Sequence, residues 1–214
     1  MKKSGVLISF EGIDGSGKST QAKLLADFLQ KKNYQVSYIR EPGGTAISEA
    51  IRKILLDRRN SGMHPRTELL LFLAARAELV DKVILPAIRR GSIVVTDRFH
   101  DSTFAYQIYG RRLPGEIVRL LNSFAVRTVN PDLTFLVDLD VRQAHRRLAH
   151  AKDRMEGADR AFHSRVRKGF LALAKEEPRR IKLLDGNRAE EEIWENVRAI
   201  TTRVLRRRGF EFKH

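Results

Sequence analysis

The chain contains no cysteine among its 214 residues. Disulfide bonds, thiolate metal sites and cysteine nucleophiles are therefore excluded for this sequence. Long apolar runs are also missing, and the hydrophobic stretch near the N-terminus is only a few residues long, without a small-residue cleavage pattern. We find no internal repeat, no low-complexity tract and no linker rich in proline and glycine. These absences favour a cytoplasmic protein without a membrane partner, folded as one compact domain over residues 1–214.

Acidic residues are few relative to basic ones. The 41 Lys plus Arg against 26 Asp plus Glu give a net charge of +15, which raises the question of a nucleic-acid partner. The basic residues are spread along the chain as repeated arginine pairs, which are typical of solvated surfaces and helix C-termini. No recognisable nucleic-acid-binding module accompanies them. We therefore expect a small anionic substrate and no nucleic acid, with a basic nucleic-acid-binding ATPase as the alternative from another class.

Five short apolar segments have the β-branched composition of strands that are buried on both faces: Val6–Phe10, Val36–Ile39, Ile93–Thr96, Leu133–Val137 and Ile181–Leu184. Segments with helical spacing lie between and after them: Ser19–Lys32, Ala46–Asp57, Arg66–Arg90, Pro114–Phe124, Val141–His150, Ala161–Lys175 and Ala189–Arg207. This alternation predicts an α/β fold with a five-stranded parallel sheet and helices on both faces. The long helical excursions after the second strand and around residues 141–175 are typical of a substrate pocket and a lid.

The segment FEGIDGSGKST, which begins at Phe10, joins a predicted strand to a predicted helix. From Gly12 to Ser19 it fits the spacing G-x-x-x-x-G-K-[ST] of a phosphate-binding loop, in which glycines let successive backbone N–H groups converge on phosphate oxygens. Lys18 is expected to reach the β- and γ-phosphates, and Ser19 is expected to ligate Mg²⁺. The predicted donor-binding residues are Gly12, Ile13, Asp14, Gly15, Ser16, Gly17, Lys18, Ser19 and Thr20.

A second carboxylate is expected at the C-terminal end of another buried strand, because the crevice of a parallel sheet opens there. Asp97 has this position, and Arg98 follows it. We predict that Asp97 holds the metal, directly or through water, or accepts a proton from the attacking group. Arg98 is predicted to neutralise an acceptor phosphate.

A phosphate-binding loop alone does not distinguish a GTPase, an ATPase motor and a kinase of small molecules. The sequence has no N-K-x-D motif for reading guanine and no second nucleotide motif of the helicase type. Arginines instead follow the ends of strands, and a kinase of an anionic acceptor needs cations on both sides of the transferred group. The pattern therefore favours a kinase that acts on a phosphorylated small molecule.

Several segments, in this order, resemble bacterial thymidylate kinases: FEGIDGSGKST, REPGGT (Arg40–Thr45), FLAAR (Phe72–Arg76) and DRFHDSTFAYQ (Asp97–Gln107). The later segment DRMEGADRAFHSRVRKGFLALA is similar to the lid of that family and the helix after it. The resemblance covers nearly the whole chain. It implies a P-loop NTPase fold of the nucleoside monophosphate kinase type, with a helical lid over about residues 141–160. The implied activity is phosphorylation of dTMP to dTDP by ATP and Mg²⁺, for dTTP biosynthesis, in a homodimer.

The resemblance also implies roles for single residues. Phe72 stacks on the thymine ring, and Arg76 donates to a base oxygen. Arg98, helped by Arg52, binds the acceptor monophosphate. The other implied substrate contacts are Thr103 and Gln107 at the base edge, Tyr106 over the deoxyribose, Asp14 at the sugar 3′-hydroxyl, and Glu41 acting through water near the metal or sugar.

The phosphate loop carries no arginine, so the resemblance implies that basic residues of the lid supply the remaining positive charge. The candidates are Arg146, Arg147 and Arg154. Together with Lys18 and Arg98 they are expected to stabilise the transferring phosphoryl group. A kinase of another monophosphate or of a nucleoside, built on the same scaffold, is the nearest alternative.

Overall fold

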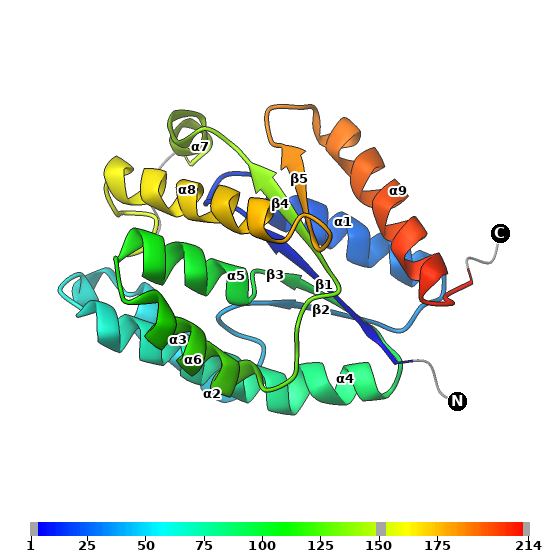
Figure 1. Ribbon diagram of the computed structural model, residues 1–214, viewed down its shortest axis with the longest axis horizontal. Coiled ribbons are helices and arrows are strands. Elements are labelled where there is room, and N and C mark those ends of the chain that lie inside the picture. Colours follow the sequence, from blue (N-terminus) through cyan, green and yellow to red (C-terminus); the bar gives the residue numbers. More distant parts are fainter. Residues whose placement is uncertain (1–3, 149–152, 212–214) are drawn as a thin grey trace.

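The computed structural model describes residues 4–148 and 153–211. Its centre is a sheet of five strands: β1 Val6–Glu11, β2 Val36–Arg40, β3 Ile93–Asp97, β4 Leu133–Asp138 and β5 Ile181–Asp185. The strands lie in the order β2-β3-β1-β4-β5, and every neighbouring pair is parallel (Figure 1). The predicted five-stranded parallel sheet is confirmed.

Each strand extends one residue further at its C-terminal end than its apolar composition predicts. The added residue is charged in every strand, because backbone pairing continues where the buried side chains give way to the polar edge. Phe10 of β1 pairs with Asp97 of β3, so the chain leaves both strands side by side. This register places the phosphate loop next to the consecutive residues Asp97 and Arg98 at the carboxyl edge of the sheet.

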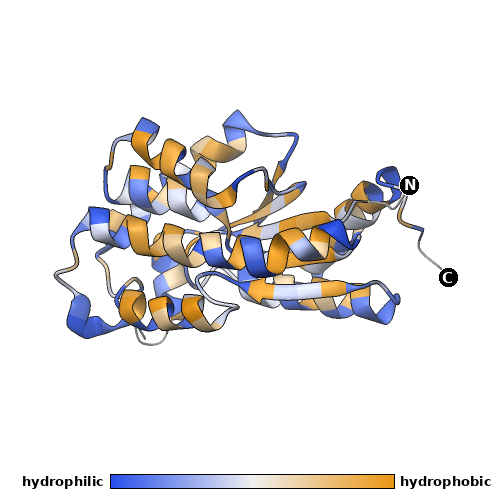
Figure 2. Ribbon diagram, turned by 90° about the horizontal axis from the view of Figure 1, so that it is seen from below, coloured by the Kyte–Doolittle hydropathy of each residue, from blue (hydrophilic) through white to orange (hydrophobic). Residues whose placement is uncertain are grey.

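Helices cover both faces of the sheet, and the strands between them are largely hydrophobic (Figure 2). Helices α1 Lys18–Lys31 and α9 Glu190–Arg207 pack on one face. Leu25 and Leu29 of α1 and Val197 of α9 join Val6 and Ile8 in one buried core cluster. The alternation of side chains along β1 turns Leu7 towards the opposite face.

The opposite face is covered by several helices: α4 Leu85–Arg89, α5 His100–Thr103, α6 Gly115–Val126 and α8 Arg160–Glu176. Helix α3 Pro65–Leu79 packs against α6, and α2 Ala46–Leu56 packs against α3. A 3₁₀ turn, Arg58–Asn60, follows α2 and leads towards α3. A large core cluster joins α3, α6 and α8 through residues such as Leu69, Val118 and Phe170. This layer forms the walls of the candidate site.

The segment predicted as one long helix over Arg66–Arg90 is helical without a gap from Pro65 to Arg89, but it is not one regular α-helix. The structure divides this region into α3, a π-helix Val80–Ile84 and the short helix α4. Pro86 lies in the first turn of α4, where its missing N–H costs little. A proline inside a continuous α-helix would leave the carbonyl four residues earlier without its donor, and the wider π turn accommodates this.

Two elements after β3 were not predicted: α5 and a π-helix that covers Phe104–Gly110. The other predicted helices are present with shifted ends, including α7 Val141–Arg147 and α8. The expected end of the first of these, His150, lies outside the described residues. No helix in the described part of the chain has the length and apolar character needed to cross a membrane.

Candidate active site

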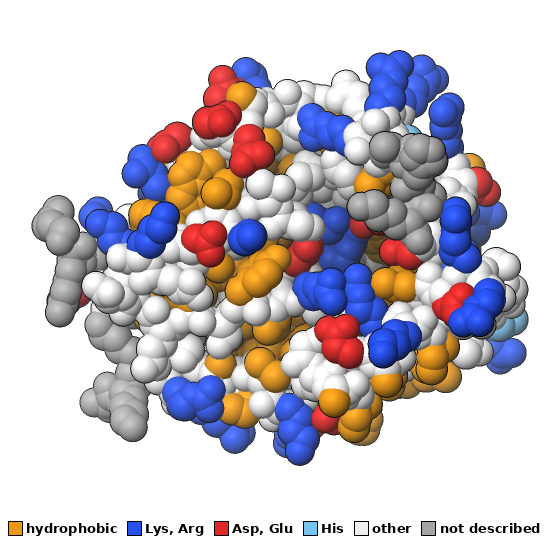
Figure 3. Space-filling view, turned by 180° about the vertical axis from the view of Figure 1, so that it is seen from behind, with side chains coloured by type: hydrophobic (Ala, Val, Ile, Leu, Met, Phe, Trp, Pro, Cys, Tyr) orange, Lys and Arg blue, Asp and Glu red, His pale blue; other side chains and the backbone are white. Residues whose placement is uncertain are grey.

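A pocket of about 380 Å³ opens beyond the carboxyl ends of β1, β2 and β3. One face of the molecule is hollowed, and lysine and arginine side chains gather around the hollow (Figure 3). Many residues that the sequence singled out line the pocket: Asp14, Lys18, Ser19, Glu41, Arg52, Phe72, Arg76, Asp97, Arg98, Thr103, Tyr106 and Gln107. Residues far apart in the sequence therefore meet in one cavity.

The phosphate loop follows β1 and ends at the N-terminus of α1, as predicted. Gly17 is the N-cap residue of α1 with φ 94°, and Gly15 has φ 80°, which are left-handed conformations that favour glycine. A Cβ atom on Gly15 would lie 2.6 Å from the carbonyl oxygen of Ala144. The loop therefore needs glycine both for its backbone conformation and for its close contact with α7. Its curvature, together with the positive end of α1, suits the binding of phosphate.

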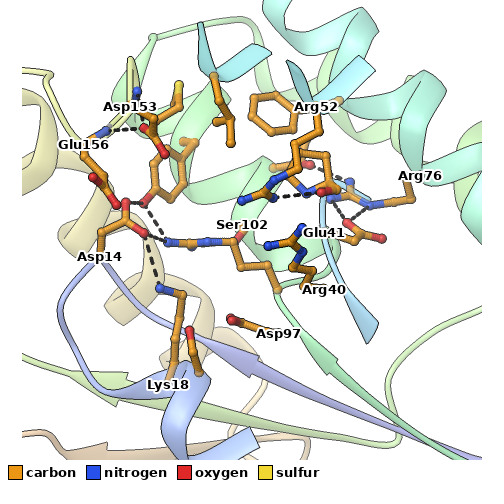
Figure 4. A pocket seen from close by; sticks show the side chains of 18 of the residues that line it. Asp14, Lys18, Arg40, Glu41, Arg52, Arg76, Asp97, Ser102, Asp153 and Glu156 are labelled. Carbon is orange, nitrogen blue, oxygen red and sulfur yellow. Dashed lines mark hydrogen bonds and ion pairs between the residues drawn. The ribbon is translucent and has the colours of Figure 1, made fainter. Parts of the chain in front are cut away.

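Asp14 is the centre of a charged cluster at the loop end of the pocket (Figure 4). Its carboxylate accepts hydrogen bonds from Lys18 at 3.3 Å, Arg98 at 2.5 Å and the Tyr106 hydroxyl at 3.1 Å. Burial alone would raise the pKa of Asp14, but Arg98 and Lys18 outweigh it and hold that pKa well below its usual range. Asp14 therefore stays ionised and orients two cations towards the pocket.

Arg98 lies where several elements converge. Besides Asp14, its guanidinium donates to the Gly12 carbonyl and the Ser102 hydroxyl, each at 3.0 Å. Although burial by itself lowers the pKa of Arg98, the surrounding Asp14 and the other acidic groups raise it above the ordinary value. The guanidinium is therefore charged over the whole accessible pH range.

Glu11 supports the backbone around Arg98, which has φ 72°, an uncommon conformation for a residue with a side chain. The Glu11 carboxyl accepts from the Phe99 backbone N–H at 2.8 Å and from the Ser102 hydroxyl at 2.6 Å. Burial, followed by repulsion from Asp101, raises the pKa of Glu11 to about 8. A fully buried carboxyl group thus fixes the turn that presents Arg98, and no local sequence pattern singles it out.

Asp97 and Ser19 both line the pocket, with Ser19 exposed on the first turn of α1. One carboxylate oxygen of Asp97, Oδ1, is buried and has no hydrogen-bond partner among the described residues. A buried carboxylate oxygen without a donor is an unfavourable arrangement that a hard cation relieves, and Mg²⁺ prefers oxygen ligands. The hydroxyl and the carboxylate therefore form a donor set that fits Mg²⁺ beside the phosphate loop.

The far end of the pocket has a planar wall and buried polar groups. Phe72 and Arg76 of α3 line it, and the Arg76 guanidinium is 3% exposed. Arg76 donates to Glu41 at 2.7 Å and to the Thr103 hydroxyl at 2.5 Å. Burial raises the pKa of Glu41 although Arg76 opposes the rise. Because Arg76 also donates to the Asn122 side chain and the Phe99 carbonyl, its position is fixed rigidly before any ligand arrives.

Arg52 lies between the two ends of the pocket and donates to the Pro42 carbonyl at 2.8 Å. Burial lowers the pKa of Arg52, and the nearby positive charge of Arg40 lowers it further. Two arginines that repel each other across a cavity favour the binding of an anion between them. Arg40 was not predicted, although the quoted segment REPGGT contains it and it ends β2 beside Asp97.

The arginines predicted in the lid do not line the pocket in this structure. Arg154 is 8% exposed and donates to Glu68 at 2.6 Å and to the Leu55 carbonyl at 2.8 Å. Arg147 donates to the Gly186 carbonyl at 3.0 Å. Arg146 lines a separate hollow with Arg142, His145 and Arg160. None of these arginines shares the cavity with Lys18 and Arg98.

Several residues that line the pocket were missed by sequence reasoning. The sequence did carry a signal for some of them, since they lie inside or directly beside the segments quoted above. These residues are Tyr38, Arg40, Pro42, Leu56, Ser102, Asp153, Met155 and Glu156. Asp153 and Glu156, which belong to the predicted lid region, bring two carboxylates to the pocket (Figure 4).

Comparisons with known proteins agree on one family. A family model described as thymidylate kinase matches residues 10–197. A thymidylate kinase from Pelobacter propionicus is 48% identical over 212 residues, which is 95% of each chain, and one from Symbiobacterium thermophilum is 46% identical over 204 residues, again 95% of each chain. The crystal structure of thymidylate kinase from Ehrlichia chaffeensis superposes with a TM-score of 0.76 at 35% identity. That match covers 92% of this chain and 99% of the other.

Proposed function

Because the chain belongs to the thymidylate kinase family, we propose that it transfers the γ-phosphoryl group of ATP to dTMP, with Mg²⁺, and releases dTDP for dTTP biosynthesis. The observation that carries this proposal is one continuous pocket in which a phosphate loop faces a wall formed by Phe72 and Arg76. Residues 1–214 would form one kinase domain with a lid over about residues 141–160. These substrates belong to nucleotide metabolism, so the proposal includes a cytoplasmic location.

Lys18 and Arg98 are the cations best placed to act on the transferred group, because both contact Asp14 at the loop end of the pocket. Lys18 would neutralise charge on the donor phosphates, and Arg98 would hold the acceptor phosphate in line with them. Their shared partner Asp14 keeps both side chains oriented and would itself accept a hydrogen bond from the sugar hydroxyl. Positioning and electrostatic stabilisation account for most of the catalysis of phosphoryl transfer.

Ser19 and Asp97 would hold the magnesium ion. When bound, Mg²⁺ would supply positive charge that offsets the negative charge of the phosphates. The unpartnered Oδ1 atom of Asp97 supports this assignment, because the atom is buried and its residue lines the same cavity as Ser19. Lid residues, including Arg146, Arg147 and Arg154, would reach the donor only after a rearrangement from their present contacts. Closure of the lid would also exclude water and suppress hydrolysis of ATP.

The test is a coupled assay of ADP release with a panel of acceptors. We expect dTMP to give the highest kcat/KM, dUMP a lower value, and dCMP, AMP and thymidine values that are lower by at least about two orders of magnitude, because the pocket must pair polar groups on both base and phosphate. Chelation of Mg²⁺ by EDTA should stop turnover with every acceptor. An equal or better rate with dCMP, AMP or thymidine would replace the base assignment with another kinase on the same scaffold.

We also propose that the protein is a homodimer whose interface is formed by α2, α3 and α6. Among the described residues, six of the eight large hydrophobic side chains that are strongly exposed belong to these helices: Ile47, Ile54, Leu70, Ile117, Leu120 and Phe124. The helices pack side by side, and Phe124 is 85% exposed. An apolar face of this kind is typical of a surface that another subunit covers.

Replacing Phe124 with glutamate is expected to convert the dimer to a monomer at micromolar concentration, because a charge would be buried at the centre of the interface. Light scattering coupled to size-exclusion chromatography measures the mass directly. Leu183→Glu is the matched control, since Leu183 is 55% exposed on β5, away from these helices. A monomeric wild-type protein, or a dimer that survives the Phe124 change, would contradict this interface.

A further inference from the structure

Glu68 of α3 is a fully buried carboxylate whose partners come from distant segments of the chain. Arg111 donates to it through Nε at 3.0 Å and through a terminal nitrogen at 2.9 Å, and Arg154 donates at 2.6 Å. The side-chain amide of Gln107 donates to it at 3.0 Å. Both oxygens of Glu68 accept from these donors, and a carboxylate accepts hydrogen bonds but donates none.

Gln107 lines the candidate active site and is 1% exposed. A glutamine amide can present either its NH₂ group or its oxygen to a ligand, and the choice is normally set by the surrounding hydrogen bonds. Because Glu68 can only accept, Gln107 must turn its nitrogen towards Glu68. The oxygen of Gln107 is then the polar atom left for a ligand in the pocket.

We infer that Glu68 is a positioning residue that sets base selection by fixing the orientation of the Gln107 amide. This inference rests on the proposed function and deepens it. An acceptor at Gln107 pairs with the N3–H group of thymine or uracil. Cytosine carries an acceptor at N3, so its lone pair would face the Gln107 oxygen with no proton between them. A mismatch of this kind at a buried site costs about 10- to 100-fold in kcat/KM.

Glu68→Gln tests the inference, because it replaces the acceptor-only group by one that can also donate. The side-chain oxygen of the introduced glutamine can still accept from Arg111 and Arg154, and its nitrogen can donate to the Gln107 oxygen. Gln107 is then free to present its NH₂ group, which cytosine N3 accepts. We expect the ratio of kcat/KM for dCMP to that for dTMP to rise by at least about tenfold. The ratio for dUMP to dTMP should stay within about twofold of the wild-type value, because the two bases share the same polar edge.

Glu68→Asp is the conservative variant, since it keeps an acceptor-only group and should leave the dCMP to dTMP ratio within about twofold of the wild-type value whatever happens to overall activity. Arg111→Met is a second control, because it removes a partner of Glu68 without giving that residue a donor. If Glu68→Gln lowers the rates with dTMP and dCMP by the same factor, Glu68 has a structural role only and the inference is overturned.

Glu68→Gln leaves Arg111 and the buried Arg154 with a neutral partner and can fail to fold. In that case Gln107→Met decides, because it removes the discriminating oxygen while keeping side-chain length. The dCMP to dTMP ratio must then rise by at least about tenfold, and an unchanged ratio overturns the inference, since Glu68 cannot act through an oxygen that does not discriminate. The proposed function fails by a different result, which is measured before any variant is made: a wild-type enzyme that does not prefer dTMP.

Discussion

Alanine at Lys18 is expected to lower kcat for dTMP phosphorylation by about 10³-fold, because a preorganised cation beside the transferred phosphoryl group is lost. Lys18 is 5% exposed at the start of α1 and faces the pocket, so water does not replace the missing charge efficiently. The KM for dTMP should change only a few-fold, since Arg98 still holds the acceptor end. Steady-state kinetics with each substrate varied in turn separates these parameters.

The fold should survive the Lys18 change. The described contact of the Lys18 ammonium is a 3.3 Å hydrogen bond to Asp14, and Asp14 keeps its hydrogen bonds to Arg98 and Tyr106. We expect a melting temperature within a few degrees of wild type. Lys23→Ala is the matched control, because Lys23 is an exposed residue on the same helix. Turnover of Lys18→Ala within about tenfold of that of Lys23→Ala would contradict the role of Lys18.

The phosphate-loop end of the site was predictable because its information is local. Gly12–Ser19 carries loop, lysine and hydroxyl in one short segment, so spacing alone determines which groups converge. The Asp97 and Arg98 pair was predictable for a related reason. Parallel strands end at a common edge, so a charged residue after an apolar strand is placed next to the loop once the sheet is inferred.

Other parts of the site depend on contacts between distant segments, and no local pattern encodes them. Glu11 looks like the polar end of a strand, yet it is fully buried and binds Phe99 and Ser102, far along the chain. Glu68 looks like a surface glutamate in the first turn of a helix, yet it is fully buried and meets Gln107 from a separate element. Buried charges of this kind are invisible to hydrophobic periodicity, because that signal assigns charged residues to the solvent face.

The π-helix inside the helical segment predicted over Arg66–Arg90 shows a different limit. Pro86 indicates an irregularity in the helix, but the apolar spacing continues across it and predicts one long helix. The π-helix at Val80–Ile84 keeps Val80 and Ile84 packed in the core while the backbone bonding changes. Periodicity reports which face is buried, and it does not report the hydrogen-bonding pattern that achieves the burial.

Arg98→Met is expected to lower kcat/KM for dTMP by about 10³-fold, chiefly through a higher KM for dTMP, whereas the KM for ATP should change only a few-fold. Methionine keeps a flexible unbranched chain but loses the charged, planar donor group. Arg98→Lys should recover only part of the loss, because one ammonium group cannot reproduce the contacts of a guanidinium fork with Asp14, the Gly12 carbonyl and a phosphate. Since the pKa of Arg98 is raised above its ordinary value, the defect should be the same from about pH 6 to about pH 9.

The size of this effect follows from how rigidly Arg98 is held. Two hydrogen bonds maintain the left-handed backbone conformation of Arg98. The Thr96 hydroxyl donates to the Arg98 carbonyl oxygen at 2.7 Å, and the Phe99 backbone N–H donates to the Glu11 carboxyl group. A strained turn persists only where surrounding bonds determine it, so the guanidinium meets the acceptor phosphate without reorganising first. Arg119→Met is the control for loss of an arginine, because Arg119 is an exposed residue of α6 that pairs with Glu176 of α8 and lies outside the pocket. If Arg98→Met instead raises the KM for ATP and leaves the KM for dTMP unchanged, Arg98 binds the donor. The assignment of Arg98 to the acceptor phosphate is then wrong.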